Sequence, residues 1–356
     1  MQIGIIGLPN SGKTTIFNAL TRSDTETEAF SSGQVDVHTA VVDVPDKRVD
    51  ALSAMFNPKK TTYAKVTYND IAGFGKGAAK SGLSGPLLNA MAANDALLLV
   101  VRAFEDENVP HPDDRIDPAR DLSSMESELM LNDMTVIDRR LERLNGQKNR
   151  GTTDERKRMA EEEELLKRLM AALEEEKPLR DLEIGEEERK MLGGFGLLSL
   201  KPILRVINAG DDAEEADFAA LLNSLTFLLR GRLEAEIAQM DTAEAIEFLA
   251  DFGIDEPGLN RAIRFSYDML GLQSFFTVGE DEVRAWTVEV GARAPEAAGV
   301  IHTDLQKGFI RAEVMSYADL MEAGSLAELK KLGKFRLEGK EYVVRDGDIL
   351  NIRFNL

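Results

Sequence analysis

Cysteine is absent from the 356 residues of this chain, and so are long apolar runs. Without cysteine there are no disulfide bonds and no thiolate metal sites, which is compatible with a reducing compartment. The longest apolar run, "ALLLVV" at residues 96–101, is far shorter than the roughly 20 residues that span a bilayer. The N-terminus shows no basic segment followed by a long apolar stretch. We therefore expect a cytoplasmic protein with no signal peptide and no membrane partner.

Positive charge and histidine are also scarce. The chain has 43 basic and 63 acidic residues, a formal net charge of −20. Such a charge, spread evenly, repels nucleic acid, so any contact with RNA requires a local basic patch. His38 and His111 fall in predicted loops with no sign of a partner, and His302 is expected to be a hydrogen-bonded structural residue. No histidine–carboxylate cluster has the spacing of a metal site.

The most specific motif is "GLPNSGKTT" at residues 7–15, which fits the phosphate-binding loop template at every fixed position. A predicted strand at residues 2–6 precedes it, and a predicted helix begins at Thr14. Backbone N–H groups of the loop and the positive end of the helix then face one point, where they stabilise an anion. The alternative is a glycine-rich turn that binds nothing. The phosphate-binding residues predicted by the motif are Ser11, Gly12, Lys13, Thr14 and Thr15.

A second nucleotide signal follows the next predicted strand, where Asp70-Ile71-Ala72-Gly73 fits the Asp-x-x-Gly element of nucleotide switches. In this interpretation Lys13 reaches the β- and γ-phosphates, Thr14 binds Mg²⁺, Asp70 holds a Mg²⁺-bound water and the Gly73 N–H senses the γ-phosphate. Lys13, Thr14, Asp70 and Gly73 are therefore the predicted catalytic residues, and Thr14 and Asp70 the predicted metal site.

The segment after Asp70 is rich in glycine, which makes it costly to order without a ligand. That composition suits a loop that is ordered by a nucleoside triphosphate and released after hydrolysis. Phe74 stands where Ras-like switches carry the glutamine that orients the attacking water. A phenyl ring makes no such hydrogen bond, so we expect slow intrinsic hydrolysis.

The base-binding signal is "NAGD", which follows a predicted strand at residues 201–208. Asn208 and Asp211 have the spacing with which such folds read the nucleotide base. Guanine-specific switches have lysine at the second position, where this chain has Ala209. Asp211 can accept hydrogen bonds from guanine, whereas adenine offers an acceptor at N1. The alternative is a solvated turn.

Four compositional zones define the predicted domains. Alternating apolar runs and helical stretches over residues 1–118 predict the first part of an α/β nucleotide-binding domain with a mostly parallel sheet. Two apolar stripes at helical spacing within 119–192 predict an inserted pair of antiparallel helices. Residues 193–272 return to the α/β pattern and complete that domain. The strand-rich residues 273–356 predict a small α+β domain, with a turn at 345–348 between two strands.

The inserted helices are expected to form a coiled-coil-like arm, although two helices lying flat on the main domain also fit the pattern. The tip of the arm, residues 138–158, holds eight basic and four acidic residues against the acidic trend of the chain. A basic tip on an acidic body could place cations on ribosomal RNA. A solvated charged hairpin is the alternative.

These residues resemble the YchF subfamily of the Obg-like ATPases, within the translation-factor-related P-loop NTPases. The motifs that carry the resemblance are "GLPNSGKTTIFNALT", "DIAGFGKGA", "VVRAFED", "RLEAEI" and, above all, the C-terminal "EVRAWTV…GFIRAEVMSYADL…YVVRDGDILNIRFN". The resemblance implies a G domain, an inserted helical hairpin and a C-terminal TGS domain of β-grasp fold. It also implies a ribosome-associated NTPase that prefers ATP to GTP.

The same resemblance adds three site residues. Asn10 stands where potassium-activated relatives have a cation-coordinating asparagine, which implies stimulation by K⁺. Backbone near Arg230 and Gly231 is implied to flank the base. A hydrophobic residue in place of the glutamine is usual in the subfamily, and Phe74 matches it.

Three positions depart from the family pattern. Asp211 replaces the usual glutamate of the base-binding motif, and its shorter side chain changes the reach to the base, which leaves GTP binding open. Gln34 occupies the place of the threonine that reaches Mg²⁺, so Ser32 or Thr39 would have to substitute. Ser11 replaces the usual valine.

We therefore predict a slow, Mg²⁺-dependent purine NTPase, with ATP or GTP as ligand and a ribosomal or RNA partner. The rival hypothesis is a nucleotide-gated binding protein with negligible turnover, which Phe74 and Gln34 favour. A GTP-specific switch also stays open. A small-molecule kinase is disfavoured, because Asp-x-x-Gly combined with Asn-x-x-Asp belongs to switches and no arginine-rich lid is evident.

Overall fold

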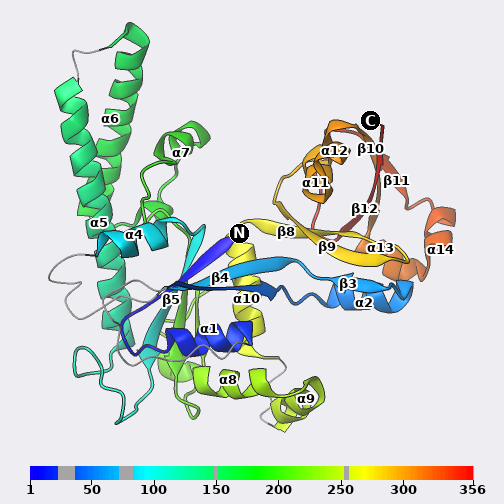
Figure 1. The fold of residues 1–356 in the computed structure, drawn as a ribbon, viewed down its shortest axis with the longest axis horizontal. Coiled ribbons are helices and arrows are strands. Elements are labelled where there is room, and N and C mark those ends of the chain that lie inside the picture. The colour runs from blue at the N-terminus through cyan, green and yellow to red at the C-terminus, as the bar shows by residue number, and fades with distance from the viewer. Residues whose placement is uncertain (23–36, 72–82, 148–150, 252–255, 356) are drawn as a thin grey trace. The chain divides into compact units, whose positions relative to one another are not determined.

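The computed structural model describes residues 1–22, 37–71, 83–147, 151–251 and 256–355 (Figure 1). The chain divides into two compact units. The first comprises Met1–Ala40 and Thr67–Leu259, and the second comprises Val41–Val66 and Asn260–Leu356. Residues 41–66, which we predicted in the first part of the nucleotide-binding domain, and residues 260–272, predicted in its second part, cluster with the C-terminal chain.

A six-stranded sheet of order β2-β4-β1-β5-β6-β7 runs through the first unit. Strand β1 pairs in parallel with β4 and β5, and β5, β6 and β7 continue the parallel arrangement. The predicted central strand at 96–101 is thereby confirmed: seven successive residues of β5 are buried, as expected for a parallel strand covered on both faces. The strands are β1 (Gln2–Ile6), β2 (Val37–Asp43), β4 (Lys65–Ile71), β5 (Ala96–Ala103), β6 (Ile203–Ala209) and β7 (Thr226–Leu229).

Short helices connect these strands. Among the described residues, no helix is long and apolar enough to cross a membrane. The helices and 3-10 turns of the first unit, apart from the arm, are α1 (Lys13–Thr21), α4 (Gly85–Ala92), η1 (Leu179–Asp181), α7 (Glu186–Leu192), η2 (Glu215–Phe218), α8 (Gly231–Gln239) and α9 (Thr242–Asp251).

The predicted pair of antiparallel helices is confirmed as α5 (Pro118–Gln147) and α6 (Thr153–Glu174), which form a projecting hairpin (Figure 1). Leu122, Met125 and Leu129 at the start of α5 pack in the core beside the sheet. From Met130 onward α5 shares a separate apolar core with α6. Thr152 and Glu155 form a capping box that starts α6.

The second unit contains a six-stranded mixed sheet of order β11-β10-β12-β8-β9-β3. Strand β3 lies at its edge and pairs in parallel with β9, which explains why residues 41–66 belong to this unit. The strands are β3 (Lys60–Thr62), β8 (Leu272–Thr277), β9 (Glu282–Glu289), β10 (Phe309–Ser316), β11 (Arg336–Glu338) and β12 (Asp348–Phe354). The helices are α2 (Lys47–Phe56), α10 (Gly258–Met269), α11 (Ala294–Ile301), α12 (Thr303–Lys307), α13 (Tyr317–Ala323) and α14 (Leu326–Lys331).

The turn predicted at residues 345–348 is present, with Gly347 in the left-handed region at φ 83° and the Asp348 N–H donating to Arg345 O at 3.1 Å. The prediction of a strand before this turn is wrong. Residues 341–344 make a single bridge, between Val343 and Arg293, instead of a ladder. The Asp348 carboxylate accepts from the Tyr342 hydroxyl at 2.7 Å and from the Arg345 N–H at 2.9 Å, which holds this segment by side-chain contacts.

Candidate functional site

The phosphate loop joins β1 to α1. Two of its residues adopt left-handed backbone, Asn10 at φ 63° and Gly12 at φ 90°. A Cβ atom at Gly12 would lie 2.1 Å from Asn208 Nδ2, so only glycine fits beside that amide. The first N–H groups of α1 lack intrahelical acceptors, as at every helix start. The positive end of α1 therefore lies at the end of this loop, which is the arrangement that the phosphate-loop motif requires for stabilising an anion.

Lys13 folds back over this loop. Its Nζ donates to Gly7 O at 3.0 Å and to Leu8 O at 2.9 Å. Desolvation by the surrounding loop lowers the pKa of Lys13 to about 8, although the charge of Asp70 opposes this shift. The two carbonyl oxygens place the ammonium group inside the loop, where a phosphate would meet it.

Thr14 and Asp70 meet beside Lys13. Thr14 Oγ1 donates to Asp70 Oδ2 at 2.8 Å, which brings together the two predicted metal-site residues from α1 and the end of β4. Asp70 is only 2 % exposed, and its other oxygen, Oδ1, receives no hydrogen bond from the described residues. A buried carboxylate oxygen without a donor is costly unless a ligand or water satisfies it. Carboxylate and hydroxyl oxygens also suit Mg²⁺, so these residues fit a magnesium ion held with the phosphates.

Asn208, at the end of β6, connects the loop to the next helix. Its Nδ2 donates to Ser11 O at 2.9 Å, and its Oδ1 accepts from Gly231 N at 3.0 Å. Asn208 is 4 % exposed. The structure thus brings together three of the predicted nucleotide residues, Ser11, Asn208 and Gly231, and shows that the amide of Asn208 braces the site.

The other predicted base residues lie around the turn after β6. Arg230 donates from Nε (3.2 Å) and Nη2 (2.8 Å) to Ala213 O and so fixes this turn beside the end of β7. Asp211 is exposed on the same turn. Thr15 is half-buried in the first turn of α1.

Of the residues named for the missing switch threonine, Thr39 lies on β2 and donates from its hydroxyl to Asn69 Oδ1 at 2.7 Å. Asn69 and Asp70 are neighbours on β4, and successive side chains of a strand point to opposite faces. Thr39 therefore contacts the face opposite to Asp70. Ser32, Gln34, Gly73 and Phe74 lie outside the described residues.

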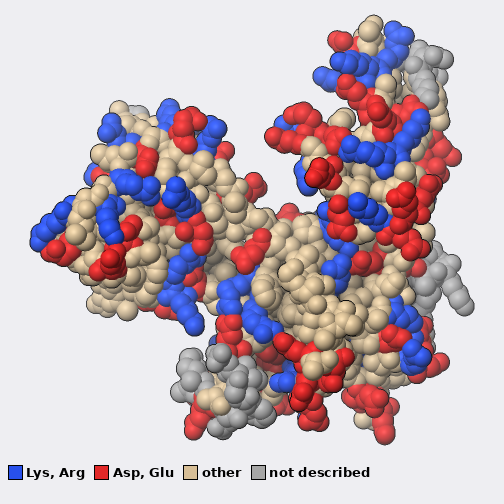
Figure 2. Space-filling model, turned by 180° about the vertical axis from the view of Figure 1, so that it is seen from behind, with Lys and Arg blue, Asp and Glu red and all other residues tan. Residues whose placement is uncertain are grey.

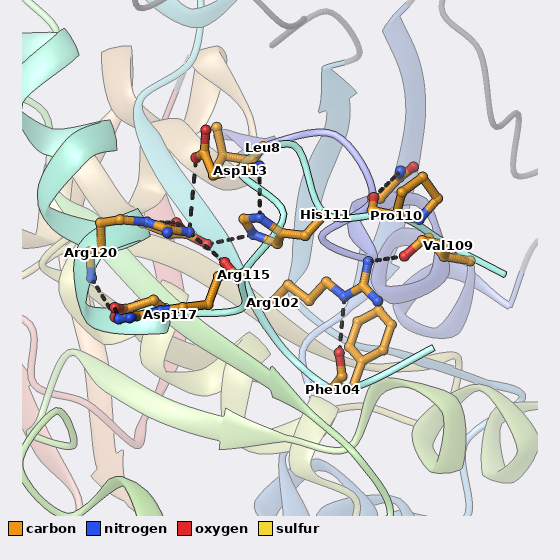
Figure 3. A network of polar contacts seen from close by, with 12 residues as sticks. Leu8, Arg102, Phe104, Val109, Pro110, His111, Asp113, Arg115, Asp117 and Arg120 are labelled. Carbon is orange, nitrogen blue, oxygen red and sulfur yellow. Dashed lines mark hydrogen bonds and ion pairs between the residues drawn. The ribbon is translucent and has the colours of Figure 1, made fainter. Parts of the chain in front are cut away.

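A buried polar network next to the phosphate loop was not predicted (Figure 3). His111, which we placed in a loop without a partner, is 7 % exposed and lies 2.9 Å from Asp121 Oδ2 through its Nε2. Arg102, 2 % exposed at the end of β5, donates to Phe104 O at 2.9 Å and to Val109 O at 2.7 Å. Arg102 and Phe104 fall within "VVRAFED", one of the segments that carry the family resemblance, but no periodic pattern in the following loop predicts that His111 meets Asp121 or that Arg102 meets Val109. His302 in contrast is an exposed helix cap, whose Nδ1 accepts from Asp304 N at 3.2 Å.

Comparison with protein families and known proteins places this geometry in context. Residues 2–138 match the family described as 50S ribosome-binding GTPase. Residues 272–355 match the YchF-GTPase_C family, described as a protein of unknown function (DUF933).

Three relatives match along nearly their whole length. The ribosome-binding ATPase YchF of Bacillus subtilis is 41% identical over 368 residues, covering 100% of both chains. Obg-like ATPase 1 of Caenorhabditis elegans is 37% identical, and the match covers 100% of this chain and 92% of that protein. The solved structure of the Schizosaccharomyces pombe YchF GTPase is 33% identical, with a TM-score of 0.86 over 99% of this chain and 97% of that chain. The phosphate loop, the parallel sheet and these matches define a P-loop nucleoside triphosphatase. The chain belongs to the YchF subfamily of the Obg-like ATPases.

Proposed function

We propose that this P-loop NTPase hydrolyses ATP slowly with Mg²⁺, accepts GTP less well, and acts on the ribosome in the cytoplasm. The observation that carries the nucleotide site is the contact of Thr14 with a buried Asp70 whose Oδ1 lacks a donor among the described residues. Ribosome binding is supported by the name of the B. subtilis relative, a ribosome-binding ATPase, and by the basic residues of the arm tip.

Each residue of the site has a separate task in this proposal. Lys13 exchanges the carbonyls of Gly7 and Leu8 for phosphate oxygens and balances their charge. Thr14 offers its hydroxyl oxygen to the metal, and Asp70 accepts hydrogen bonds from the metal's water ligands. Mg²⁺ supplies charge neutralisation at the phosphates. Asn208 hydrogen-bonds to both Ser11 and Gly231. It thereby fixes the phosphate loop relative to the backbone that would flank the base.

Base preference and potassium activation are finer parts of the proposal. The family resemblance favours ATP, whereas Asp211 can accept hydrogen bonds from guanine. Asn10 is the residue that would coordinate K⁺. Its Nδ2 donates to Pro110 O at 2.9 Å, whereas Oδ1 is the atom that would coordinate K⁺, so this hydrogen bond and a bound potassium ion are compatible.

Multiple-turnover phosphate release tests the proposal. It is measured with ATP and with GTP, in K⁺ and in Na⁺, with and without ribosomes, and compared with Lys13→Ala. We expect release above that of Lys13→Ala, faster with ATP than with GTP and stimulated by K⁺. The rival function, a nucleotide-gated binding protein, is favoured by Phe74 in place of the water-orienting glutamine. Release that never exceeds that of Lys13→Ala, while nucleotide still binds, would establish the rival.

A further inference from the structure

A hydrogen bond joins the segment between β5 and α5 to the phosphate loop. Asn10 Nδ2 donates to Pro110 O at 2.9 Å, across 100 residues of sequence. Asn10 holds the left-handed conformation of the loop at φ 63°, so its side chain and the loop backbone move together. Pro110 is followed directly by His111, and the backbone carbonyl that accepts from Asn10 is the one joined to the His111 nitrogen.

His111 is fixed on both sides of its ring (Figure 3). Its Nδ1 accepts from the Asp113 N–H at 3.1 Å. Because Nδ1 is an acceptor, the proton of a neutral imidazole lies on Nε2, which donates to Asp121 Oδ2 at 2.9 Å. His111 and Asp121 are 7 % and 1 % exposed, so water does not compete for this contact.

Asp121 belongs to the first turn of α5, the helix that continues into the arm. Its second oxygen, Oδ1, accepts from Arg120 Nε at 3.1 Å and Nη2 at 2.8 Å. The carboxylate is thus paired with a cation and keeps both oxygens engaged. A continuous set of contacts runs from the start of the arm helix through His111 and Pro110 to Asn10 of the phosphate loop.

We propose that His111 and Asp121 are positioning residues for the phosphate loop: the pair fixes the Pro110 carbonyl, which fixes the amide of Asn10. The start of α5 and the loop then respond together when a nucleotide binds. This inference rests on the proposed nucleotide site. The alternative is that the His111–Asp121 pair only stabilises its own loop, which Arg102 already anchors through Phe104 O and Val109 O.

A double-mutant cycle separates the two possibilities, because connected residues show non-additive effects whereas independent ones add. Asn10→Gly removes the amide and still permits positive φ. Asp121→Leu removes the acceptor of His111 at similar volume. Binding of Mg²⁺–ATPγS to the full chain is measured by calorimetry in Na⁺, so that any potassium role of Asn10 does not contribute. Thermal unfolding confirms that each variant is folded.

We expect each single substitution to weaken binding about fivefold, the effect of losing one hydrogen bond. The double variant should be weakened about five- to tenfold, well short of the roughly 25-fold product expected for independent residues. Asp121→Asn keeps one acceptor oxygen for His111 but loses the oxygen that accepts from Arg120, so its affinity should fall between those of the wild type and Asp121→Leu. Arg115→Ala removes an exposed ion pair with Asp117 in the same segment, leaves the acceptor of the Arg120 N–H in place, and should bind normally.

A double variant that reaches the product of the single effects would overturn the inference, as would a folded Asp121→Leu protein with wild-type affinity. Should Asp121→Leu not fold, His111→Phe replaces it in the cycle, because it keeps the ring shape without the nitrogens. Absence of binding by the wild type would instead contradict the proposed function.

Discussion

At the scale of single residues, the site depends on an ammonium group that is partly desolvated before any ligand arrives. Lys13 has a pKa of about 8 in the free protein. Phosphate binds the protonated ammonium group of Lys13, so Lys13 keeps its proton to a higher pH in the nucleotide-bound protein than in the free protein. The free protein loses that proton as the pH rises through about 8, and binding must then take up a proton from solvent.

Nucleotide affinity should therefore fall as the pH rises above 8. We expect Mg²⁺–ATPγS to bind about tenfold more weakly at pH 9 than at pH 7, as one pH unit beyond the pKa implies. Lys13→Arg is the control, since its guanidinium stays charged over this range, and its affinity should not change with pH. An equally flat profile in the wild type would show that Lys13 does not titrate there.

A second residue-scale prediction concerns Gly12. Gly12→Ala would place a Cβ 2.1 Å from Asn208 Nδ2 at a backbone φ of 90°. The clash separates Asn208 from Ser11 O, so we expect at least a tenfold loss of nucleotide affinity with a smaller loss of stability. Gly85→Ala, with no atom within 4 Å of the added Cβ, is the matched control. Normal binding by Gly12→Ala would mean that Asn208 does not brace the loop.

At the scale of elements, one buried carboxylate joins α5 to the segment that leads into β6. Asp133 is 0 % exposed and accepts from Leu198 N at 2.8 Å and Ser199 N at 2.7 Å. Asp133→Ala leaves two buried N–H groups without acceptors, which should lower the free energy of unfolding by about 2–4 kcal/mol. Urea unfolding measures this loss, and the exposed Asp138→Ala on the same helix should be neutral. Equal midpoints for both variants would contradict this role for Asp133.

The arm is the element through which we expect ribosomal RNA to be contacted. Exposed cations lie near its tip, among them Arg139, Arg143, Arg156 and Arg158, whereas Arg140 is paired with Glu162 at 2.7 Å. Figure 2 shows Lys and Arg side chains near the tip of the arm and Asp and Glu along its body. Lys148 and Arg150 lie outside the described residues.

Reversing two of these charges tests the arm. Arg156→Glu with Arg158→Glu should weaken co-sedimentation with ribosomes, and more so at low salt, where charges are less screened. Lys167→Glu with Arg168→Glu makes the same change in net charge on the acidic body of the arm and should have little effect. An equal loss of ribosome binding in both double variants would show that the net charge of the protein, and not the arm tip, decides binding. Unchanged binding of Arg156→Glu with Arg158→Glu across a salt series would reject the arm as the contact.

At the scale of the whole molecule, the C-terminal unit includes residues far away in sequence. Arg48 on α2 binds Asp346 at 2.6 Å and lies 5.1 Å from the Phe276 ring centroid. Asp346 Oδ1 also accepts from Ser274 N at 3.0 Å. The chain thus completes this unit with a segment that precedes most of the nucleotide-binding unit.

Arg48→Leu should consequently destabilise the C-terminal unit by about 2 kcal/mol, the value of a charged hydrogen bond in a partly buried site. Trp286 is the single tryptophan of the chain and lies on β9 in this unit, so its fluorescence reports this transition. The neighbouring, exposed Lys47→Leu should leave the denaturation midpoint unchanged. A midpoint unaffected by Arg48→Leu would show that residues 41–66 contribute little to this unit.

The sequence predicts what is contiguous or periodic. The phosphate loop occupies one short segment, β5 is one apolar run, and α5 and α6 carry apolar stripes at helical spacing. Contacts between distant residues were not predictable in this way. Asn208 contacts Gly231 and Ser11, His111 contacts Asp121, and β3 pairs with β9. Folding brings these partners together from distant parts of the chain, and no local sequence pattern specifies them. The strand expected at 341–344 is only an isolated bridge to Arg293, with backbone hydrogen bonds from Ala294 N to Tyr342 O and from Val344 N to Ala292 O, and it does not extend into a ladder.

The most direct test of the nucleotide site is a calorimetric titration of the pure, folded chain with ATPγS and with a slowly hydrolysed GTP analogue, with and without Mg²⁺. The buried Asp70 and its contact with Thr14 predict Mg²⁺-dependent heat with at least one of the two, sharply reduced in Asp70→Ala. The family resemblance predicts that the adenine nucleotide binds more strongly. No heat with either triphosphate in the presence of Mg²⁺ would contradict the account.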